Sequence, residues 1–453
     1  MIKNKKRFMI LFMLLFIIFS SVLVQGMSLD HQSIFIPHEM EVLPNGMRVI
    51  VKEIPDYPVA AVNIWVGAGG RHDPRGKSGL AHYFEHMLFK GTEERSKNEI
   101  SREIESAGGN LNAMTGLEYT SYYIVVPSDN VSIAMDVQSD AVRNSQFPEN
   151  EMNYERDVIE QEIKDRDSSP RTALLDASIQ NLFAGTPYER PVIGDEDDLS
   201  DIKREDMIDF YEKYYVPNNM TLVVVGDVEA EDIFAKARKY YGDMEGSSVP
   251  SQEQVTIPEL QEVEEIKKER DVEQSYLFMA FPGPRMGQPD AVALETAGII
   301  LGQGRASRLY SLLRDEKELV TSISSGYQSY ADMGLFWIMA ELPPENRDQV
   351  EDILRKEIEK MAEGEISEKE LERAQSMVRS SFAFDAESNL DIALTMGQME
   401  TQASIKSAVN MVKTIESISE KEIKDAVSNY LDPDAYIYGQ LDPEGEGGKD
   451  NEE

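Results

Sequence analysis

The feature that most constrains this fold is an internal repeat in the chain. Residues 122–127, rich in tyrosine, isoleucine and valine, precede a helix and then a further helical segment at 147–163. The same order returns at 335–343, a helix, and 366–382. Two generic strand–helix–helix units would give a similar pattern, and this alternative stays open. A true repeat predicts two related halves, because each copy must bury the same apolar faces.

The two copies differ in their acidic residues. Aligning their last helical segments places Glu155 opposite Ala374 and Glu162 opposite Ser381. The first copy therefore carries carboxylates that the second has lost. This difference bears on which half holds a functional site.

Composition divides the rest of the chain. Its 453 residues are enough for two or three domains. The segment 242–264 is rich in Ser, Pro, Gln and Glu and has weak periodicity, as linkers do. The segment 442–453 is an acidic tail that cannot form a core. These boundaries predict a first domain at 27–241 and a second at 265–441. Strands are expected at 47–51, 59–66, 120–126 and 220–225, and helices at 79–89, 97–106, 129–143 and 149–167.

The N-terminal 26 residues have the layout of a secretory signal. Four basic residues among the first seven precede an apolar run at 8–24, and no acidic residue occurs before Asp30. Residues 24–26 offer a cleavage site. The run is also near the minimum length for crossing a bilayer, so an uncleaved membrane anchor is the alternative. We expect a protein exported from a bacterial-type cell, periplasmic or extracellular, whose membrane contact is limited to this segment.

The charge balance excludes one class of partner. The chain has 45 Lys and Arg against 83 Asp and Glu, a net charge of −38. Such a surface repels phosphate backbones, so we expect no nucleic-acid binding. The surplus either keeps the protein soluble or provides an acidic lining that attracts basic peptides.

One short motif points to metal chemistry. The chain has no cysteine, so a transition-metal site must use His, Asp or Glu. Two of its five histidines lie in the sequence His82-Tyr83-Phe84-Glu85-His86. Four residues apart on a helix, the two rings project from one face, where a single ion can contact both. The pattern is the inverse of the commoner His-Glu-x-x-His zinc motif.

The residue types suit a zinc hydrolase. Neutral imidazoles hold zinc and leave a position for water, whose pKa the metal lowers. Glu85 is placed to take the proton from this water and pass it to the leaving amine. A helix with solvated histidines is one alternative. A metal-storage protein is another, although it would have no need of Glu85.

A third protein ligand is needed, and a carboxylate is expected. Glu155 and Glu162 are attractive because a spacing of seven residues puts them on one helix face, with Val158 and Ile159 between them. Carboxylates beside an apolar strip are costly without a partner, and a cation is a natural one. An exposed acidic face would show the same spacing, so the residues alone do not choose the ligand.

Several ordered blocks resemble the pitrilysin-like (M16-type) peptidases, in particular the half-length branch with the mitochondrial processing peptidase β-subunit and bacterial relatives. The match extends from about residue 40 to residue 439. The blocks are LPNG at 43–46, GLAHYFEHMLFKGT at 79–92, GGNLNAMT at 108–115, ERDVIEQE at 155–162, PY at 187–188 with Gly194, and YVPNNM at 215–220.

This resemblance implies both a fold and a site. The fold is α+β, with two similar domains that are each a sheet backed by helices, only the first keeping the metal. His82, His86 and Glu162 would bind one zinc ion per chain, Glu85 would be the general base, and Glu155 would orient the site. The implied activity is that of a zinc metalloendopeptidase acting on unfolded or extended peptides. Half-length members pair two chains into a clamshell, so we expect a homodimer or a heterodimer with a related chain. A non-catalytic scaffold subunit is the alternative.

The resemblance also implies substrate-binding residues. Asn112 and Ala113 match an edge strand to which a peptide adds as a further strand. Arg314 matches an arginine that grips substrate together with a tyrosine seven residues later. Here that position is Thr321, which lacks the ring. The departure suggests that a partner chain supplies the missing group.

Overall fold

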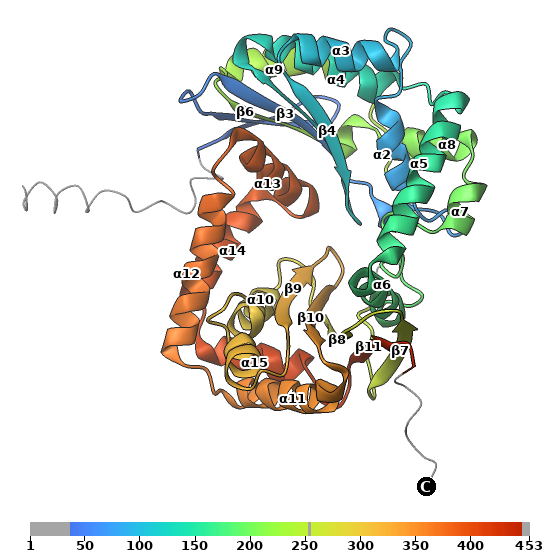
Figure 1. Cartoon of the computed structure of the whole chain (residues 1–453). Helices are drawn as coiled ribbons and strands as arrows, with labels where there is room; N and C mark the ends of the chain where they lie inside the picture. Colours follow the sequence, from blue (N-terminus) through green and yellow to red (C-terminus); the bar gives the residue numbers. More distant parts are fainter. Residues whose placement is uncertain (1–36, 252–254, 446–453) are drawn as a thin grey trace, which may run out of the picture.

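The computed structural model describes residues 37–251 and 255–445, which form two sheets with helices around them (Figure 1). The expected signal peptide or anchor at 1–26 lies outside the described residues, as does most of the expected acidic tail. Among the described residues, no helix has the length and apolar character needed to cross a membrane.

The first half is built on a six-stranded sheet with the order β1-β2-β6-β3-β5-β4. Only β2 and β6 pair in parallel. The strands are β1 (Glu39–Val42), β2 (Arg48–Glu53), β3 (Val59–Val66), β4 (Asn110–Thr115), β5 (Thr120–Pro127) and β6 (Met220–Gly226). The helices are η1 (Gly70–His72), α2 (Leu80–Leu88), α3 (Lys97–Ser106), η2 (Ser128–Asn130), α4 (Val131–Asn144), α5 (Glu149–Ser168), α6 (Pro170–Leu182), α7 (Glu196–Asp201), α8 (Arg204–Tyr214), η3 (Pro217–Asn219) and α9 (Ala230–Tyr241).

The second half repeats this plan on a five-stranded sheet with the order β7-β11-β8-β10-β9. Only β7 and β11 pair in parallel. The strands are β7 (Glu264–Arg270), β8 (Ser275–Gly283), β9 (Ser322–Ser329), β10 (Gly334–Leu342) and β11 (Ile437–Pro443). The helices are α10 (Pro289–Gly302), η4 (Tyr310–Glu316), η5 (Pro344–Asn346), α11 (Arg347–Glu363), α12 (Glu368–Phe384), α13 (Asn389–Gln402), α14 (Ile405–Ser417) and α15 (Glu420–Tyr430). The predicted α+β class, with two similar domains of largely antiparallel sheet backed by helices, is confirmed.

The central strands of the first sheet, β3 and β6, are almost entirely apolar, with Asn63 and Thr221 as their polar residues. In β3 every residue after Val59 is buried, and all of β6 is buried. Continuous apolar runs of this kind are typical of strands covered on both faces. Helices α4 and α9 cover one face. The other face is covered by a helix from the second half.

The two halves exchange helices. Helix α13 packs along β3 and β6 of the first sheet, while α6 packs along β8 and β11 of the second. Gly397 of α13 lies so close to Trp65 that a Cβ atom there would be 1.9 Å from the indole Nε1. Gly439 of β11 likewise leaves space for Ser178 of α6, where a Cβ would lie 2.4 Å from the hydroxyl oxygen. The domain boundaries drawn from the sequence stay a prediction, but this packing crosses the expected division between halves twice.

The second sheet also ends later than expected. Strand β11 runs through Asp442 and Pro443, beyond the predicted domain end at 441. Asp442 accepts a hydrogen bond from Ser275 Oγ at 2.6 Å and pairs with Arg347 at 2.6 Å. Pairing with β7 therefore includes two residues that the sequence analysis assigned to the acidic tail.

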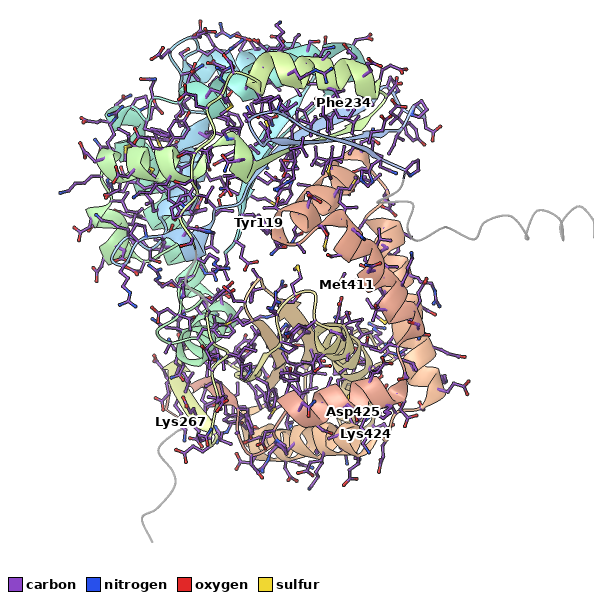
Figure 2. The ribbon with its side chains drawn as sticks, turned by 180° about the vertical axis from the view of Figure 1, so that it is seen from behind. Tyr119, Phe234, Lys267, Met411, Lys424 and Asp425 are labelled. Atoms are coloured by element: carbon purple, nitrogen blue, oxygen red, sulfur yellow. The ribbon has the colours of Figure 1, made fainter. Side chains whose placement is uncertain are left out.

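A buried polar cluster ties the halves together beside the exchanged helix. Arg71 pairs with Glu118 at 3.0 Å and with Asp332 at 2.5 Å, and its side chain is only 4% exposed. Glu118 also accepts hydrogen bonds from Tyr188 at 2.6 Å and from Gln402 at 2.8 Å. The cluster thus joins the β4–β5 turn, the β9–β10 turn and the end of α13. Tyr119, next to Glu118 in the β4–β5 turn, packs on the Trp65 ring (Figure 2).

Replacing Arg71 by Met should lower the free energy of unfolding by about 3–5 kcal/mol, because Glu118 would keep a buried charge without its cation. Urea denaturation followed by tryptophan fluorescence would measure this, since Trp65 and Trp337 report one half each. The control is Arg102→Met on the exposed side of α3, which should change stability by no more than about 0.5 kcal/mol. Equal effects of the two substitutions would contradict the role of the cluster.

Candidate metal centre

The helix that carries both histidines, α2, is anchored at its N-terminus by a buried aspartate. Asp73 accepts hydrogen bonds from the backbone N–H of Gly79 at 2.8 Å and of Ala81 at 2.9 Å. Burial raises the pKa of Asp73 to about 7, although these backbone bonds oppose the shift. Gly79 has φ 90°, and a Cβ there would lie 2.5 Å from the carbonyl oxygen of Ile193. The sequence prediction missed Asp73, because it lies too far before the helix to be recognised as a local cap.

The structure brings His82, His86 and Glu162 together between α2 and α5. Glu162 Oε2 lies 3.9 Å from His82 Nε2 and 3.7 Å from His86 Nε2. The centroids of the two rings are 4.8 Å apart. Within the part of the chain that the structure describes, this is the only group of three or more His, Asp or Glu side chains with metal-ligand spacing.

The donor set fits a zinc ion. Tetrahedral zinc, with bonds of about 2.0–2.2 Å, holds its ligand atoms roughly 3.4 Å apart, so small rotations of these side chains would complete the site. Glu162 is 43% exposed on its side chain and is free to rotate. Burial, with help from the nearby His86 and Arg166, lowers the pKa of His82 to about 3, which keeps the ring in the neutral form that binds metals. The buried His82 Nδ1 has no hydrogen-bond partner among the described residues, and a cation on Nε2 would hold this ring in place.

Glu155, one of the two carboxylates singled out in the sequence, orients a histidine. Its Oε2 lies 3.1 Å from His86 Nδ1, so Nδ1 donates the hydrogen bond. The other ring nitrogen, Nε2, faces Glu162 and keeps its lone pair for a metal ion. Lys90 donates to the other carboxylate oxygen, and Lys97 lies 3.9 Å from it. Burial alone would raise the pKa of Glu155, but the hydrogen bonds with Lys90 and His86 outweigh it and lower this pKa. The two lysines, which the sequence prediction missed, therefore keep Glu155 ionised.

Glu85 lies on the same helix and reaches toward the sheet edge. It accepts a hydrogen bond from the hydroxyl of Thr115 at the end of β4. Burial raises the pKa of Glu85, and the Thr115 bond opposes the shift. Glu85 directly precedes His86 on α2, so it borders the helix face that carries the two histidines. Thr115 lies in the family-like block at 108–115, but no local pattern in the sequence marks it as the hydrogen-bond partner of Glu85.

Strand β4 lies at one edge of the first sheet, and β1 lies at the other. Strand β4 pairs only with β5, where Asn112 lies opposite Tyr123 and Ala113 lies opposite Tyr122. The Ala113 N–H donates to the side-chain oxygen of Asn112 at 2.9 Å and so points away from β5. Since β4 also packs on α2, this free edge runs beside the helix that carries Glu85.

Arg314 lies in η4 of the second half and has no contact with the metal cluster among the described residues. Its Nε donates to the backbone carbonyl of Thr321 at 3.1 Å. The Thr321 hydroxyl is itself bonded to the carbonyl of Glu341 at 2.9 Å. The two residues are therefore in contact, but the threonine hydroxyl is already engaged in the sheet.

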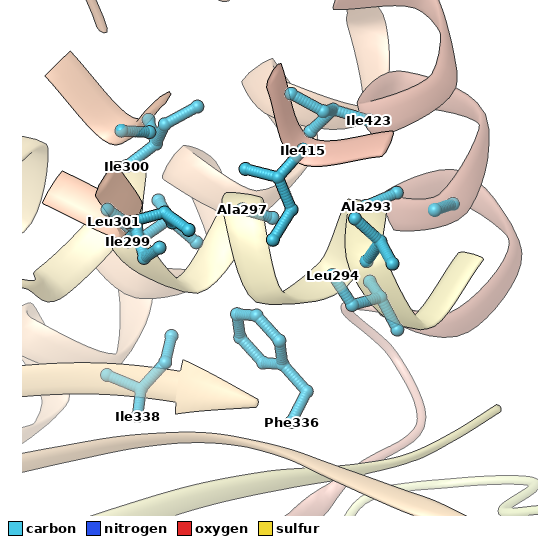
Figure 3. Packing of buried hydrophobic residues seen from close by; sticks show 14 of the residues in the cluster. Ala293, Leu294, Ala297, Ile299, Ile300, Leu301, Phe336, Ile338, Ile415 and Ile423 are labelled. Atoms are coloured by element: carbon cyan, nitrogen blue, oxygen red, sulfur yellow. The ribbon is translucent and has the colours of Figure 1, made fainter. Parts of the chain in front are cut away.

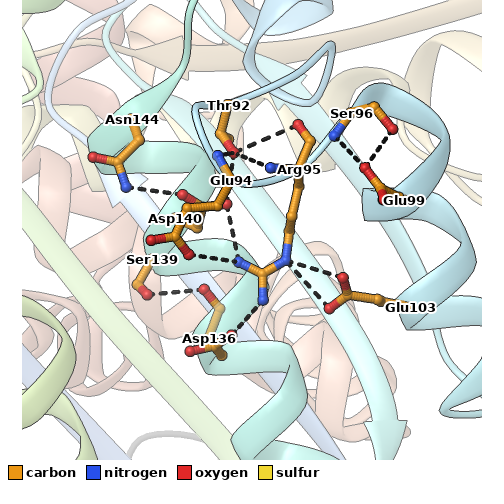
Figure 4. Close-up of polar contacts among 10 residues, drawn as sticks. All are labelled: Thr92, Glu94, Arg95, Ser96, Glu99, Glu103, Asp136, Ser139, Asp140 and Asn144. Atoms are coloured by element: carbon orange, nitrogen blue, oxygen red, sulfur yellow. Dashed lines mark hydrogen bonds and ion pairs between the residues drawn. The ribbon is translucent and has the colours of Figure 1, made fainter.

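The loop after α2 is fixed by a second arginine. Arg95 pairs with Asp140 at 2.9 Å and Asp136 at 2.5 Å on α4, and with Glu103 at 3.2 Å on α3 (Figure 4). Asp140 also accepts from Thr92 at 2.7 Å. This network fixes the backbone that follows Lys90, and it thereby helps to position the Lys90 side chain that contacts Glu155.

Sequence comparisons assign this architecture to a known class. The profile described as Insulinase (Peptidase family M16) matches residues 48–196, and that described as Peptidase M16 inactive domain matches residues 201–378. An uncharacterized zinc protease of Mycobacterium bovis is 30% identical over 411 residues, covering 89% of this chain and 92% of the relative. The chain belongs to the M16 peptidase family, which confirms the resemblance.

Further relatives agree with the half-length organisation. A probable mitochondrial-processing peptidase subunit beta from Arabidopsis thaliana is 29% identical over 400 residues, covering 86% of this chain and 75% of that protein. The crystal structure of a protease from Helicobacter pylori superposes with a TM-score of 0.84 at 24% identity, over 90% of this chain and 99% of the other. The two-domain fold is thus shared over 90% of this chain.

Glu155→Gln should weaken zinc binding by about 10–100-fold, because the amide no longer fixes and polarises His86 as a carboxylate does. Competition with a chromogenic chelator would measure the affinity. Asp157→Asn, on the exposed side of the same helix, removes one charge as well and should leave the affinity unchanged. An unaltered affinity in Glu155→Gln would refute this role for Glu155.

Proposed function

We propose that this protein is a zinc-dependent metalloendopeptidase that hydrolyses unfolded or extended peptides. The observation that carries the proposal is the meeting of His82, His86 and Glu162 at α2, the helix that also carries the half-buried Glu85. The zinc protease named among its relatives supports the same chemistry. His82, His86 and Glu162 would hold one zinc ion per chain.

Zinc bound there would act as a Lewis acid on the peptide carbonyl and would lower the pKa of water. Glu85 accepts the proton of the attacking water and delivers it to the leaving amine. The Thr115 hydroxyl holds one oxygen of Glu85, which leaves the other oxygen for the proton. Burial suits this role, because it raises the pKa of Glu85 toward the pKa values of the water and the amine with which it exchanges the proton.

Strand β4 supplies the binding edge for substrate. A peptide that pairs with β4 in extended form would use the outward N–H of Ala113 once the Asn112 side chain gives it up. Backbone pairing makes few demands on side chains, so it suits unfolded substrates of varied sequence. It also carries the peptide past Thr115 to Glu85.

The rival function is a non-catalytic scaffold subunit of a related peptidase complex, since the second half matches a profile named as an inactive domain. A scaffold has no need of the full set of His82, Glu85, His86 and Glu162. Glu155, Lys90 and Thr115 would likewise have no reason to orient these groups. The intact and oriented set favours the enzyme.

Glu85→Gln should lower kcat on a quenched, unstructured peptide by about 10²–10⁴-fold, because the amide cannot accept the proton. Bound zinc, measured by elemental analysis, should stay near one per chain, since Glu85 is not a ligand. The matched control is Glu93→Gln, on the exposed surface after α2, which should keep full activity. Retained hydrolysis by Glu85→Gln would exclude the mechanism.

The proposal includes a partner chain and an exported location. One relative is named as a subunit, which supports a partner chain. Arg314 contacts Thr321, at the position where the family resemblance implies a tyrosine, so a second chain would supply the missing substrate-binding group. Export would depend on the N-terminal 26 residues, and mass spectrometry of the mature N-terminus would test it. A mature chain that still begins at Met1 in the cytosol would exclude export.

Light scattering on the purified mature chain should give the mass of a dimer, or that of a heterodimer when a related chain is co-expressed. Peptidase activity should fall on dilution below the dissociation constant, because each chamber needs two chains. A stable monomer with full activity would defeat this expectation.

A further inference from the structure

The turn that joins β4 to β5 lies between the candidate metal centre and the second half. Thr115, which ends β4, donates a hydrogen bond to Glu85 on α2. Glu118, in the turn that follows, belongs to the buried polar cluster that joins the halves. A short segment of chain therefore connects Glu85 with the contacts between the two halves.

The second half holds Glu118 directly. The carboxylate accepts hydrogen bonds from the backbone N–H of Ala331 at 2.7 Å and from the Gln402 side chain at 2.8 Å. The first half supplies Arg71, whose guanidinium pairs with Glu118 at 3.0 Å and with Asp332 of the β9–β10 turn at 2.5 Å. Asp332 is thus the side chain with which the second half holds this arginine.

Arg71 also anchors the segment that leads to α2. The backbone N–H groups of Gly70 and Arg71 donate to carbonyl oxygens of the β4–β5 turn at 3.0 Å and 2.8 Å. A Cβ atom at Gly69 would lie only 2.2 Å from the carbonyl oxygen of Gly116, so the turn and this segment are in close contact. Because Asp73 follows Arg71 closely and caps α2, the turn and the start of the helix share one anchor.

The hairpin that carries Asp332 is itself well anchored. Strands β9 and β10 pair along their length, and the Tyr330 N–H donates to the carbonyl of Met333 at 2.7 Å to close the turn. Phe336 and Ile338 of β10 are fully buried and point toward α10 (Figure 3). The position of Asp332 therefore follows from the core of the second half.

We propose that Asp332 is a positioning residue for the hydrolysis at the metal centre. By holding Arg71 against the β4–β5 turn, Asp332 fixes the end of β4, where Thr115 holds Glu85. A carboxylate that transfers protons must stay within hydrogen-bond reach of the reacting atoms, and a misplacement of about 1 Å lowers rates by about 100-fold. This role rests on the proposed function, whereas the coupling between Asp332 and the turn does not.

The coupling is measured on the zinc-free full chain by hydrogen–deuterium exchange with mass spectrometry. Asp332→Ala should speed the exchange of amides in residues 69–73 and 114–119 by about tenfold or more, because Arg71 loses its anchor in the second half. The control Asp271→Ala removes an exposed carboxylate between β7 and β8 and should leave the exchange of both segments unchanged. Unchanged exchange in Asp332→Ala would overturn the proposal.

Turnover by the zinc-loaded chain tests the role in the reaction. Asp332→Ala should lower kcat on the quenched peptide by about tenfold or more and change KM by less than about threefold, because β4 keeps its pairing with β5. Asp271→Ala should keep full activity. In a chain that already carries Thr115→Val, Asp332→Ala should lower kcat by less than about twofold, because the hydrogen bond through which it acts is gone. A mere loss of folded protein would lower kcat equally in both chains, so equal effects would overturn the proposal.

A second variant, Asp332→Asn, guards against loss of the fold, because its amide oxygen still accepts a hydrogen bond from Arg71. It should lower kcat by a smaller factor than Asp332→Ala, and this effect should likewise vanish in the Thr115→Val chain. An effect that persists there would also overturn the proposal. Thermal unfolding would verify that each variant is folded. A parent chain without hydrolysis would refute the proposed function and the positioning role with it, while the exchange measurement would still decide the coupling.

Discussion

Each sheet of this protein has one face that a helix from the other half covers. Helix α13 covers β3 and β6, and α6 covers β8 and β11. Because apolar burial is the main stabilising term, neither half can complete its core alone. The exchange also places the ends of α6 and α13 beside the β4–β5 and β9–β10 turns, where Arg71 and Glu118 join them. The relative position of the two halves therefore follows from packing and not from the connecting segment.

The metal centre depends on this arrangement through α5. That helix carries Glu155 and Glu162, contacts α2, and continues into the exchanged helix α6. The two histidines are set by the other helix, whose start is fixed by Asp73 and whose following loop is fixed by Arg95. Helices α2 and α5 are thus anchored by separate contacts, and they meet with their metal-ligand atoms a few ångströms apart. This preorganisation limits the reorganisation that metal binding requires.

The repeat explains why the halves differ in chemistry while sharing a fold. Packing positions recur in both copies, because each sheet needs the same helical cover. Positions that face the hollow between helices are free of this demand and have diverged. In the first half they are His82, His86 and Glu162, whereas in the second Ser381 and Glu295 face the corresponding hollow. The two halves therefore share a fold but differ in the side chains that line these hollows.

The sequence by itself determined the fold class, the central strands and the helix with the two histidines. Such features follow from local periodicity, as the match of β3 and α3 to their expected bounds illustrates. Local patterns did not choose the carboxylate that joins the histidines; the family resemblance implied Glu162, and the tertiary structure brings it to them. Tertiary structure alone decided that Lys90 holds Glu155 and that Asp73 caps α2. It also decided the exchange of helices between the two halves. These contacts join residues far apart in the chain, and local patterns carry no information about which distant side chains meet.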